Sequence, residues 1–441
     1  MPRDARKTVR HGLPHMKMAG PQHMQHGASA PHTPERQKRN GPVPLVLHMA
    51  MVRAQYASAQ AALPAWRDTA HRGDKIACGP EHEAMAAWHL RYEDVSSADL
   101  ATALAAHCEA RLAAFLKGVE HYQSAQFERP PSASQIVFKA GSLTLLDHGG
   151  TGPPVLLVPS LINPSWVLDL LPGASFAEYL ISQGLRVLRV DWGTPTPAER
   201  GFNIADYVMH RLCRALSYAA DQFGPVHLIG YCLGGNLALA AALKQRQLVR
   251  SFCAIATPWD FHAMGDAARA VVAQTLNQLR PILNKTAEMP ADALQALFAQ
   301  LDPTQIERKF VDFAALDPNN LKNRRRIEHF IAVEDWSNDG PALVRGVVED
   351  CFERFYGNND PYGGHWHVAG TPVHPAALSC PSMVVAAGQD RIVPKSSTLA
   401  LGRQLPDAHL ISPSAGHVGM MVGSKAKRQC WHPVTQWMKR H

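Results

Sequence analysis

The chain has 441 residues, of which 46% are hydrophobic and 18% are charged. This composition predicts a globular protein with a sizeable core and excludes disordered, collagen-like and coiled-coil classes. No run of about 18 consecutive apolar residues occurs, so we expect no membrane-spanning helix. The first 40 residues contain no secretory signal pattern, which predicts a cytoplasmic protein.

The net charge of +7 is concentrated at the start of the chain, because residues 1–40 hold eight Lys or Arg against two acidic residues. We therefore expect residues 1–44 to form a disordered basic tail, with an arm for an anionic surface as the alternative. The remainder is nearly neutral, which argues against a nucleic-acid-binding domain. The eight scattered cysteines lack any C-x-x-C spacing, so neither a zinc site nor another metal or redox cofactor is expected.

Residues 45–131 are expected to form a small helical N-terminal region. Between residues 99 and 122, apolar side chains recur mostly at helical spacing and form one stripe, at Leu100, Leu104, Leu112, Phe115 and Val119. Packing of this stripe against the next domain is favoured over contact with a membrane or a partner. Pro130 and Pro131 mark the end of the region.

Residues 132–441 alternate short apolar strands with helices, which predicts an α/β domain with a mainly parallel sheet covered by helices on both faces. The expected strands are 136–139, 143–147, 155–158, 186–191, 226–231, 252–256, 382–387 and 408–412; the expected helices are 176–183, 204–222 and 233–244. The alternation fails between about residues 261 and 372, where the pattern is helical. An insertion of this kind predicts a cap over the site.

The most informative segment is the hexapeptide Gly-Tyr-Cys-Leu-Gly-Gly at residues 230–235, between an expected strand and an Ala/Leu-rich helix. This is the nucleophile-elbow pattern in its required setting, and it predicts Cys232 as the nucleophile. Residues on either side of such a turn lack a Cβ because backbone must pass closely there. The N-terminus of the following helix favours a thiolate and a developing oxyanion.

A base and an orienting acid are expected downstream, in the order nucleophile, acid, His. Asp390 follows the strand at 382–387, and His417 follows the strand at 408–412. These positions predict a Cys232–His417–Asp390 triad. The backbone N–H of Leu233 is the expected first oxyanion donor, and Ser160 or Leu161, with Leu161 preferred, is expected to supply the second.

The hexapeptide resembles the Cys-containing box of the polyhydroxyalkanoate synthases, which are acyltransferases with the α/β-hydrolase fold. The segments at 159–163, 168–170, 189–195, 388–394 and 416–417 also resemble that family, and coverage runs from about Leu45 to the C-terminus. The stretch at 334–340 is similar but not identical to the family's cap motif, and 355–358 resembles its Tyr-x-x-Asn element only loosely.

The resemblance implies a substrate of (R)-3-hydroxyacyl-coenzyme A, a polyester chain grown on Cys232 and association with a polymer granule surface. It also implies a homodimer or a partner subunit. Two alternatives stay open: a Cys-triad hydrolase that releases free acid from thioesters or esters, and a non-catalytic partner subunit or granule protein. The basic cluster at Lys322 and residues 324–326 is expected to be a solvated face, with contact to coenzyme A phosphates as the second interpretation.

Overall fold

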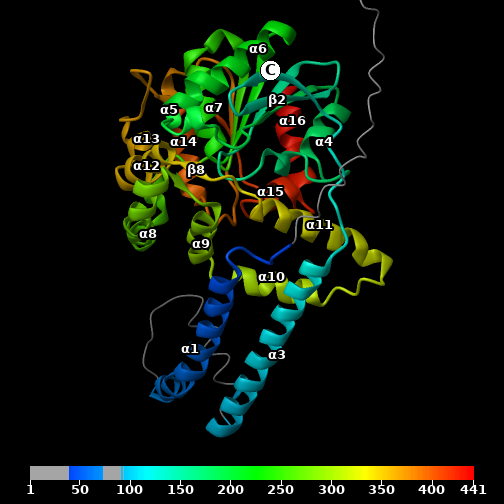
Figure 1. Cartoon of the computed structure of the whole chain (residues 1–441), viewed down its shortest axis with the longest axis vertical. Coiled ribbons are helices and arrows are strands. Elements are labelled where there is room, and N and C mark those ends of the chain that lie inside the picture. Colours follow the sequence, from blue (N-terminus) through cyan, green and yellow to red (C-terminus); the bar gives the residue numbers. More distant parts are fainter. Residues whose placement is uncertain (1–38, 73–90, 93) are drawn as a thin grey trace, which may run out of the picture. The chain divides into compact units, whose positions relative to one another are not determined.

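The computed structural model describes residues 39–72, 91–92 and 94–441 (Figure 1). The described residues belong to one compact unit, Arg39–His441. Most of the basic tail expected at residues 1–44 therefore lies outside the described residues.

A mixed sheet forms the centre of the described part of the chain, with eight strands in the order β1-β2-β4-β3-β5-β6-β11-β12. The pairs β1–β2 and β2–β4 are antiparallel, and the other neighbours are parallel. The strands are β1 (Gln135–Ala140), β2 (Leu143–Gly149), β3 (Pro154–Val158), β4 (Arg186–Asp191), β5 (Val226–Tyr231), β6 (Val249–Ile255), β11 (Ser382–Val385) and β12 (His409–Ile411).

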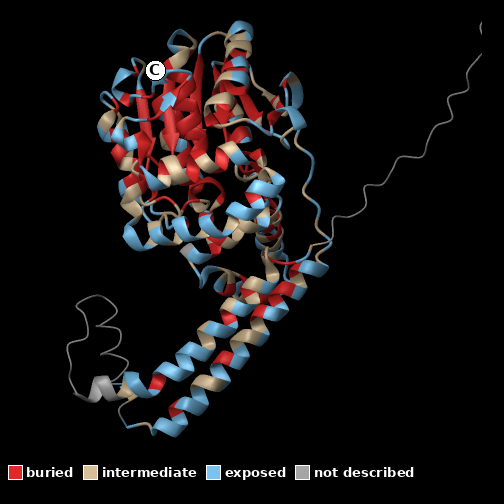
Figure 2. Ribbon diagram, turned by 60° about the vertical axis from the view of Figure 1, so that its left-hand side comes forward, coloured by how far each residue is buried: buried red, intermediate tan, exposed pale blue. Residues whose placement is uncertain are grey.

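Both faces of the sheet are buried, because successive apolar side chains of a strand point to opposite sides. On β3, Leu156 and Val158 belong to one core cluster, whereas Val155 and Leu157 belong to the other. Figure 2 shows the strands as an almost continuously buried block. The first cluster includes residues of α5 (Ile204–Tyr207), η3 (Val208–Leu212), α6 (Cys213–Phe223) and α7 (Leu233–Lys244); the second includes residues of α4 (Phe176–Ser182), α15 (Gly419–Val422), η8 (Lys427–Trp431) and α16 (His432–Met438).

The predicted α/β-hydrolase architecture is confirmed by this sheet and its two helical layers. The single helix expected at residues 204–222 is divided into α5, the π-helix η3 and α6. Shorter connections and remaining helices of this domain are η1 (Ser165–Leu168), η2 (Pro197–Glu199), η4 (Arg246–Leu248), η7 (Pro375–Ala377) and α14 (Lys395–Gln404).

The expected cap lies between β6 and β11 and is mainly helical. Its helices are η5 (Phe261–Met264), α8 (Asp266–Thr286), α9 (Ala291–Leu301), α10 (Gln305–Ala314), α11 (Leu321–Asn338), α12 (Arg345–Glu349), the π-helix η6 (Asp350–Gly357) and α13 (Asp360–Gly363). Two short antiparallel pairs join these helices, β7 (Glu288–Met289) with β8 (Leu343–Val344) and β9 (His367–Val368) with β10 (Thr371–Pro372).

The helical N-terminal region contains two long helices, α1 (Leu45–Arg72) and α3 (Ser97–Ser124). The Ser96 hydroxyl caps α3 by accepting a hydrogen bond from the N–H of Asp99 at 3.0 Å. The C-terminal half of the apolar stripe packs on the cap, in a core cluster with Val52 of α1, Phe310 and Phe313 of α10, and Ile331 of α11. None of the described helices is long and apolar enough to cross a membrane.

Close approach of α3 to α10 depends on Gly118, because a Cβ at this position would lie 2.1 Å from the carbonyl oxygen of Phe310. A larger residue would therefore push the two helices apart. The phenyl rings of Phe115 and Phe310 meet edge to face at 6.0 Å, which fills the space beside this crossing.

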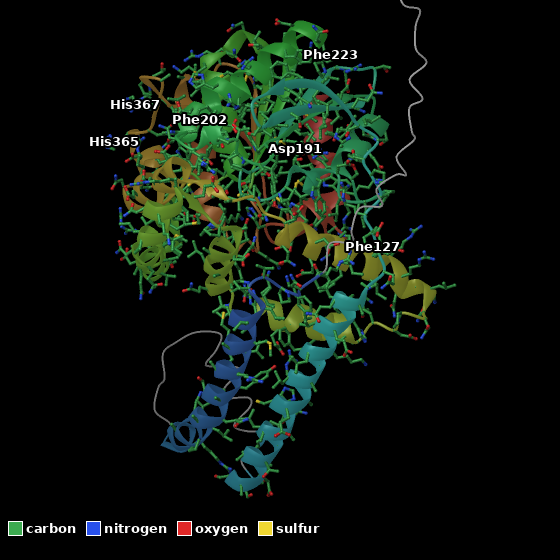
Figure 3. The ribbon with its side chains drawn as sticks, viewed as in Figure 1. Phe127, Asp191, Phe202, Phe223, His365 and His367 are labelled. Carbon is green, nitrogen blue, oxygen red and sulfur yellow. The ribbon has the colours of Figure 1, made fainter. Side chains whose placement is uncertain are left out.

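Residues 39–44 run along the C-terminal end of α11, whereas the sequence analysis assigned them to the tail. The Arg39 guanidinium donates two hydrogen bonds of 2.7 Å to the Asp335 carboxylate and one of 2.7 Å to the Phe127 carbonyl. Phe127 packs against both the N-terminal core and the core of the α/β domain, and Figure 3 labels it beside the end of α3. The chain before α1 is thus fastened to the cap.

Candidate active site

Cys232 lies at the turn between β5 and α7, with a φ of 55° that non-glycine residues rarely adopt. The glycines around it permit this turn. A Cβ on Gly230 would lie 2.3 Å from the Cα of Gly235, and one on Gly234 would lie 2.3 Å from the carbonyl oxygen of Val158. The N–H of Cys232 donates to the carbonyl of Ile255 at 2.9 Å, which fixes the turn to β6.

The N-terminus of α7 begins immediately after Cys232. The first N–H groups of a helix have no partner within that helix, and the helix dipole places partial positive charge at this end. A thiolate at Cys232, or an oxyanion next to it, is stabilised by this arrangement.

Asp390 and His417 follow β11 and β12 and lie in contact, with Nδ1 of His417 2.7 Å from Oδ2 of Asp390. The other carboxylate oxygen of Asp390 accepts hydrogen bonds from the N–H groups of Ile392 at 2.9 Å and Val393 at 2.8 Å. The Tyr231 hydroxyl donates to the His417 carbonyl at 3.2 Å. Both side chains are therefore held in place by neighbouring groups.

The pKa of His417 reflects its charged neighbours. Burial by itself lowers this pKa, but Cys232 and Asp390 outweigh burial through their charges and hydrogen bonds and raise the pKa to about 10. The imidazolium form of His417 is thus stabilised by its position between the Asp390 carboxylate and Cys232.

All three side chains line one pocket of about 890 Å³. Its inner wall comes from the loop after β3 and from the ends of β5, β11 and β12. Its outer walls come from α9, α10 and α11 of the cap and from the chain before and within α1. Among the lining residues are Pro42, Val43, His48, Ser160, Ile162, Val167, Phe298, Asp302, Arg308, Lys309, Val333, Trp336 and Arg391.

The expected oxyanion donors belong to α7 and to the loop after β3. Leu233 is the first residue of α7, and Leu161 lies in the loop after β3; both side chains are buried in the core, with exposures of 4% and 5%. The pocket is lined by the neighbouring Ser160 and Ile162, and the Ser160 hydroxyl accepts a hydrogen bond from the N–H of Ile162 at 3.2 Å. Assignment of the second donor to Ser160 or Leu161 stays a prediction.

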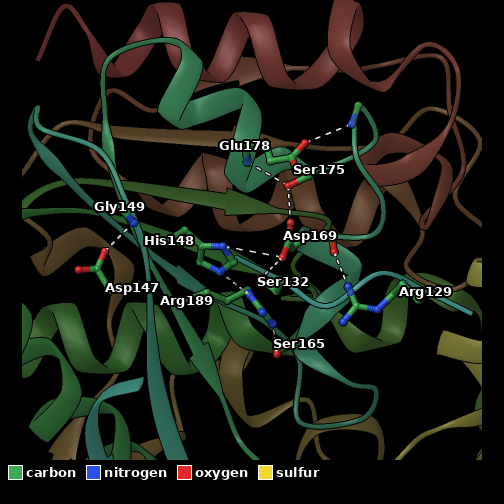
Figure 4. A network of polar contacts seen from close by, with 11 residues as sticks. Arg129, Ser132, Asp147, His148, Gly149, Ser165, Asp169, Ser175, Glu178 and Arg189 are labelled. Atoms are coloured by element: carbon green, nitrogen blue, oxygen red, sulfur yellow. Dashed lines mark hydrogen bonds and ion pairs between the residues drawn. The ribbon is translucent and has the colours of Figure 1, made fainter. Parts of the chain in front are cut away.

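Behind this loop lies a buried polar network centred on Asp169 (Figure 4). Its carboxylate accepts hydrogen bonds of 2.6 Å from the hydroxyls of Ser132 and Ser175, and one of its oxygens lies 3.8 Å from Nδ1 of His148. Arg189 donates to Nε2 of His148 at 3.1 Å and also to the Ser165 hydroxyl. Ser165 begins η1, directly after the loop that follows β3 and lines the pocket with Cys232. The network therefore fixes the last part of this loop.

The pKa of His148 is lowered to about 4 by burial and by the charge of Arg189, against smaller opposing effects of Asp169 and Asp147. Its imidazole is consequently neutral at ordinary pH, and its Nε2 accepts from Arg189. The sequence pattern alone gives no reason for the presence of Asp169 in the family-like segment at 168–170. The reason is structural, because it joins the linker after α3 to the loop after β3.

The structure also brings residues to the site that the sequence analysis did not assign to it. Tyr356 of η6 is half-buried, and burial of its hydroxyl together with the charges of Cys232 and Asp390 raises its pKa. Val43 and His48 reach the pocket from the N-terminal region. No local sequence signal identifies Val43 and His48 as pocket residues, because they reach the pocket only when distant segments pack.

The basic cluster at Lys322 and residues 324–326 lies on the first turns of α11 and is exposed. Arg324 pairs with Glu328 at 2.9 Å, one helical turn away. None of the four basic side chains is among the pocket-lining residues of the described chain. The arrangement agrees with the solvated-face interpretation.

A model of the alpha/beta hydrolase fold family matches residues 153–424. The chain belongs to this family. Its sequence is also similar to several poly(3-hydroxyalkanoate) polymerase subunits, named PhaC. The one from Haloferax mediterranei is 25% identical over 313 residues, covering 69% of this chain and 63% of the relative; the one from Allochromatium vinosum is 27% identical over 292 residues, covering 65% and 80%.

A third such subunit, from a Synechocystis species, is 28% identical over 295 residues and covers 65% of this chain and 77% of its own. The match thus spans slightly less than two thirds of the Haloferax relative's length. These similarities confirm the predicted resemblance to the polyhydroxyalkanoate synthases. Among solved structures, a thermophilic esterase from Thermogutta terrifontis is similar with a TM-score of 0.41 and 20% identity, covering 68% of this chain and 93% of that one.

Proposed function

We propose that this member of the α/β-hydrolase family transfers (R)-3-hydroxyacyl groups from coenzyme A to a growing polyester. Cys232 is the nucleophile, His417 the general base and Asp390 the residue that orients it. One observation supports this proposal above others: Asp390 and His417 meet at 2.7 Å in the pocket where the elbow presents Cys232. Similarity to poly(3-hydroxyalkanoate) polymerase subunits adds the class of acyl group.

In the acylation step, the proton of the Cys232 thiol moves to the neutral imidazole of His417, which becomes the imidazolium, and the sulfur attacks the thioester carbonyl carbon. The bond between this carbon and the coenzyme A sulfur breaks, and the leaving thiolate receives the proton from His417. The thioester that breaks and the thioester that forms on Cys232 are chemically similar, so the step has little energetic cost. Asp390 keeps Nδ1 of His417 engaged, which leaves Nε2 for the reacting groups.

In the transfer step, His417 accepts the proton of a 3-hydroxyl group, and the hydroxyl oxygen attacks the acyl group held on Cys232. The bond between the acyl carbon and the Cys232 sulfur breaks, His417 returns the proton to that sulfur, and an ester bond forms. The N–H groups of Leu233 and Leu161 are proposed to stabilise the oxyanion in both steps. Because the acyl-enzyme is a thioester, it stays reactive toward an alcohol while the cap excludes water.

With this function, the protein acts in the cytoplasm at the surface of its polymer. The names of the relatives include the word subunit, which supports assembly with a second copy or a partner subunit.

The decisive experiment mixes the purified protein with 3-hydroxybutyryl-coenzyme A, follows release of free thiol, and separates polymer from monomeric acid. We expect thiol release together with polymer. Thiol release with free acid alone would establish the hydrolase alternative. Absence of release with the full protein and 3-hydroxyacyl chains of several lengths would contradict the proposal.

A further inference from the structure

At the outer end of the pocket, one carboxylate lies between two guanidinium groups. Oδ2 of Asp302 is 2.7 Å from a terminal nitrogen of Arg391 and 3.2 Å from a terminal nitrogen of Arg308. All three residues line the pocket that contains Cys232. The Asp302 side chain is only 10% exposed, whereas those of Arg391 and Arg308 are 63% and 51% exposed.

These residues come from opposite sides of the pocket opening. Arg391 follows Asp390 directly, on the α/β domain, whereas Asp302 follows α9 and Arg308 belongs to α10 of the cap. The two guanidiniums thus converge on one point from the core and from the cap.

The charge of this group is unbalanced, because two positive side chains share one carboxylate. Each guanidinium carries five N–H donors in a planar fork, and Asp302 engages one nitrogen of each. The neighbouring Lys309 differs, since it is paired at 2.6 Å with the buried carboxylate of Glu334. Arg308 and Arg391 therefore retain donors for a further anion at the opening.

We propose that Arg308 and Arg391 bind the phosphate groups of the coenzyme A portion of the substrate, with Asp302 occupying the phosphate position when no substrate is bound. This inference rests on the proposed function, because a coenzyme A thioester places its reactive carbonyl at Cys232 and its phosphates toward solvent. Bidentate recognition of phosphate oxygens is the characteristic chemistry of converging arginines.

The first test compares two thioesters of 3-hydroxybutyrate, one with coenzyme A and one with N-acetylcysteamine, which has the same reactive group and no phosphate. In Arg391→Gln and Arg308→Gln, we expect the ratio of KM for the coenzyme A thioester to KM for the truncated thioester to rise about tenfold. The matched control is Arg324→Gln, at an exposed arginine of α11 outside the pocket, which should leave the ratio unaltered. An unchanged ratio in both pocket variants would overturn the proposal.

A second test does not depend on turnover and so separates this inference from the proposed function. Calorimetry of free coenzyme A binding to the full chain should show a dissociation constant about tenfold higher in each pocket variant than in the wild type. If the wild type does not bind coenzyme A, or if all forms bind it equally, the phosphate site is refuted. Dephospho-coenzyme A distinguishes the two sources of phosphate: a retained variant effect identifies the pyrophosphate as the occupant, and its disappearance identifies the 3′-phosphate.

The role of Asp302 has its own test. Asp302→Asn keeps the shape of the side chain and removes the competing charge, so we expect coenzyme A to bind about threefold more tightly. Binding as weak as in Arg391→Gln would overturn the placement of Asp302 in the phosphate position and make it a support for the arginines instead.

Discussion

The inner and outer ends of the pocket are built in different ways. At the inner end, Cys232, Asp390 and His417 each follow the end of a strand of the sheet. Close contacts between glycines and neighbouring backbone hold the turn at Cys232 in place. At the outer end, exposed charged side chains of the cap and of the loop after β11 surround the opening. The proposed chemistry therefore depends on close packing that tolerates little change, whereas the proposed substrate recognition depends on side chains that can be replaced individually.

The largest expected effect comes from removing the proposed nucleophile at the inner end. Cys232→Ala should reduce thiol release from 3-hydroxybutyryl-coenzyme A by at least about 10⁴-fold, because the proposed acyl-enzyme forms on the Cys232 sulfur. Mass spectrometry of the intact protein should show no acyl adduct.

The matched control is Cys380→Ser, at a half-buried cysteine that does not line the pocket. We expect it to keep the activity and the adduct. Substantial turnover by Cys232→Ala would remove Cys232 from the mechanism and with it the contrast between the two ends of the pocket.

The next effect concerns the partner of His417. Asp390→Asn should lower the rate of acylation by about 10³-fold, because an amide neither stabilises the imidazolium nor fixes its tautomer. Since Asp390 helps to raise the pKa of His417, the substitution should also lower that pKa. Rapid-mixing measurements of a single turnover would give the rate directly.

The sign of the accompanying stability effect follows from the raised pKa. In the wild type, the protonated His417 stabilises the folded state fully below pH 6.5, and this stabilisation is lost as the pH rises through about 10. In Asp390→Asn the loss should be complete at a lower pH. Urea unfolding at intervals between pH 6.5 and 10 would show it, and identical profiles for both proteins would contradict the assigned contact.

A third variant tests whether close packing holds the turn at Cys232 in place. Gly234→Ala should cost about 3 kcal/mol in the free energy of unfolding and reduce activity, because the new Cβ would lie 2.3 Å from the Val158 carbonyl oxygen. Gly201→Ala is the matched control, since nothing lies within 4 Å of its added Cβ, and it should stay within about 0.5 kcal/mol of the wild type. Equal stability of the two variants would show that the elbow can relax.

A smaller effect is expected at the network behind the loop after β3. The folded-state pKa of His148 is lowered to about 4, so as the pH falls below 6.5 this histidine binds a proton in the unfolded chain before it does so in the folded protein. The folded state therefore loses stability between pH 6.5 and about pH 4. His148→Gln should reduce this loss by on the order of 2 kcal/mol. Denaturant unfolding at pH 7 and pH 4 measures the difference.

His210→Gln provides the comparison for this variant, because His210 is exposed. Because it leaves the contacts of His148 in place, it should keep the loss of stability that His148 causes between pH 7 and pH 4. If the stability of His148→Gln depended on pH as that of the wild type does, His148 would not remain neutral in the folded protein.

The sequence predicts those parts of the molecule whose structure follows from a local pattern of residue types. The strands of the sheet were expected close to their observed bounds, since each is an apolar run flanked by breakers; the strand expected at 252–256, for example, is β6 at Val249–Ile255. Asp390 and His417 were expected together because both follow strands that end at one edge of a parallel sheet. Their 2.7 Å contact agrees with that expectation of proximity.

The rest depends on packing between segments far apart in the chain. Asp302 and Arg391 are 89 positions apart and meet only when α9 lies over the end of β11. Arg39 and Asp335 are 296 positions apart, and neither has a local pattern that names the other. The π-helix η3 likewise interrupts a segment whose apolar spacing is that of an ordinary helix, so periodicity could not reveal it.

The attachment of residues 39–44 to α11 bears on how such an enzyme could be dissected or recombined. The family match begins at residue 153, yet Val43 and His48 form part of the pocket wall. A fragment cut at the family boundary would retain Cys232, Asp390 and His417 while leaving one side of their chamber open to bulk water. The smallest exchangeable module for protein engineering therefore starts near Arg39, more than a hundred positions before the homologous segment.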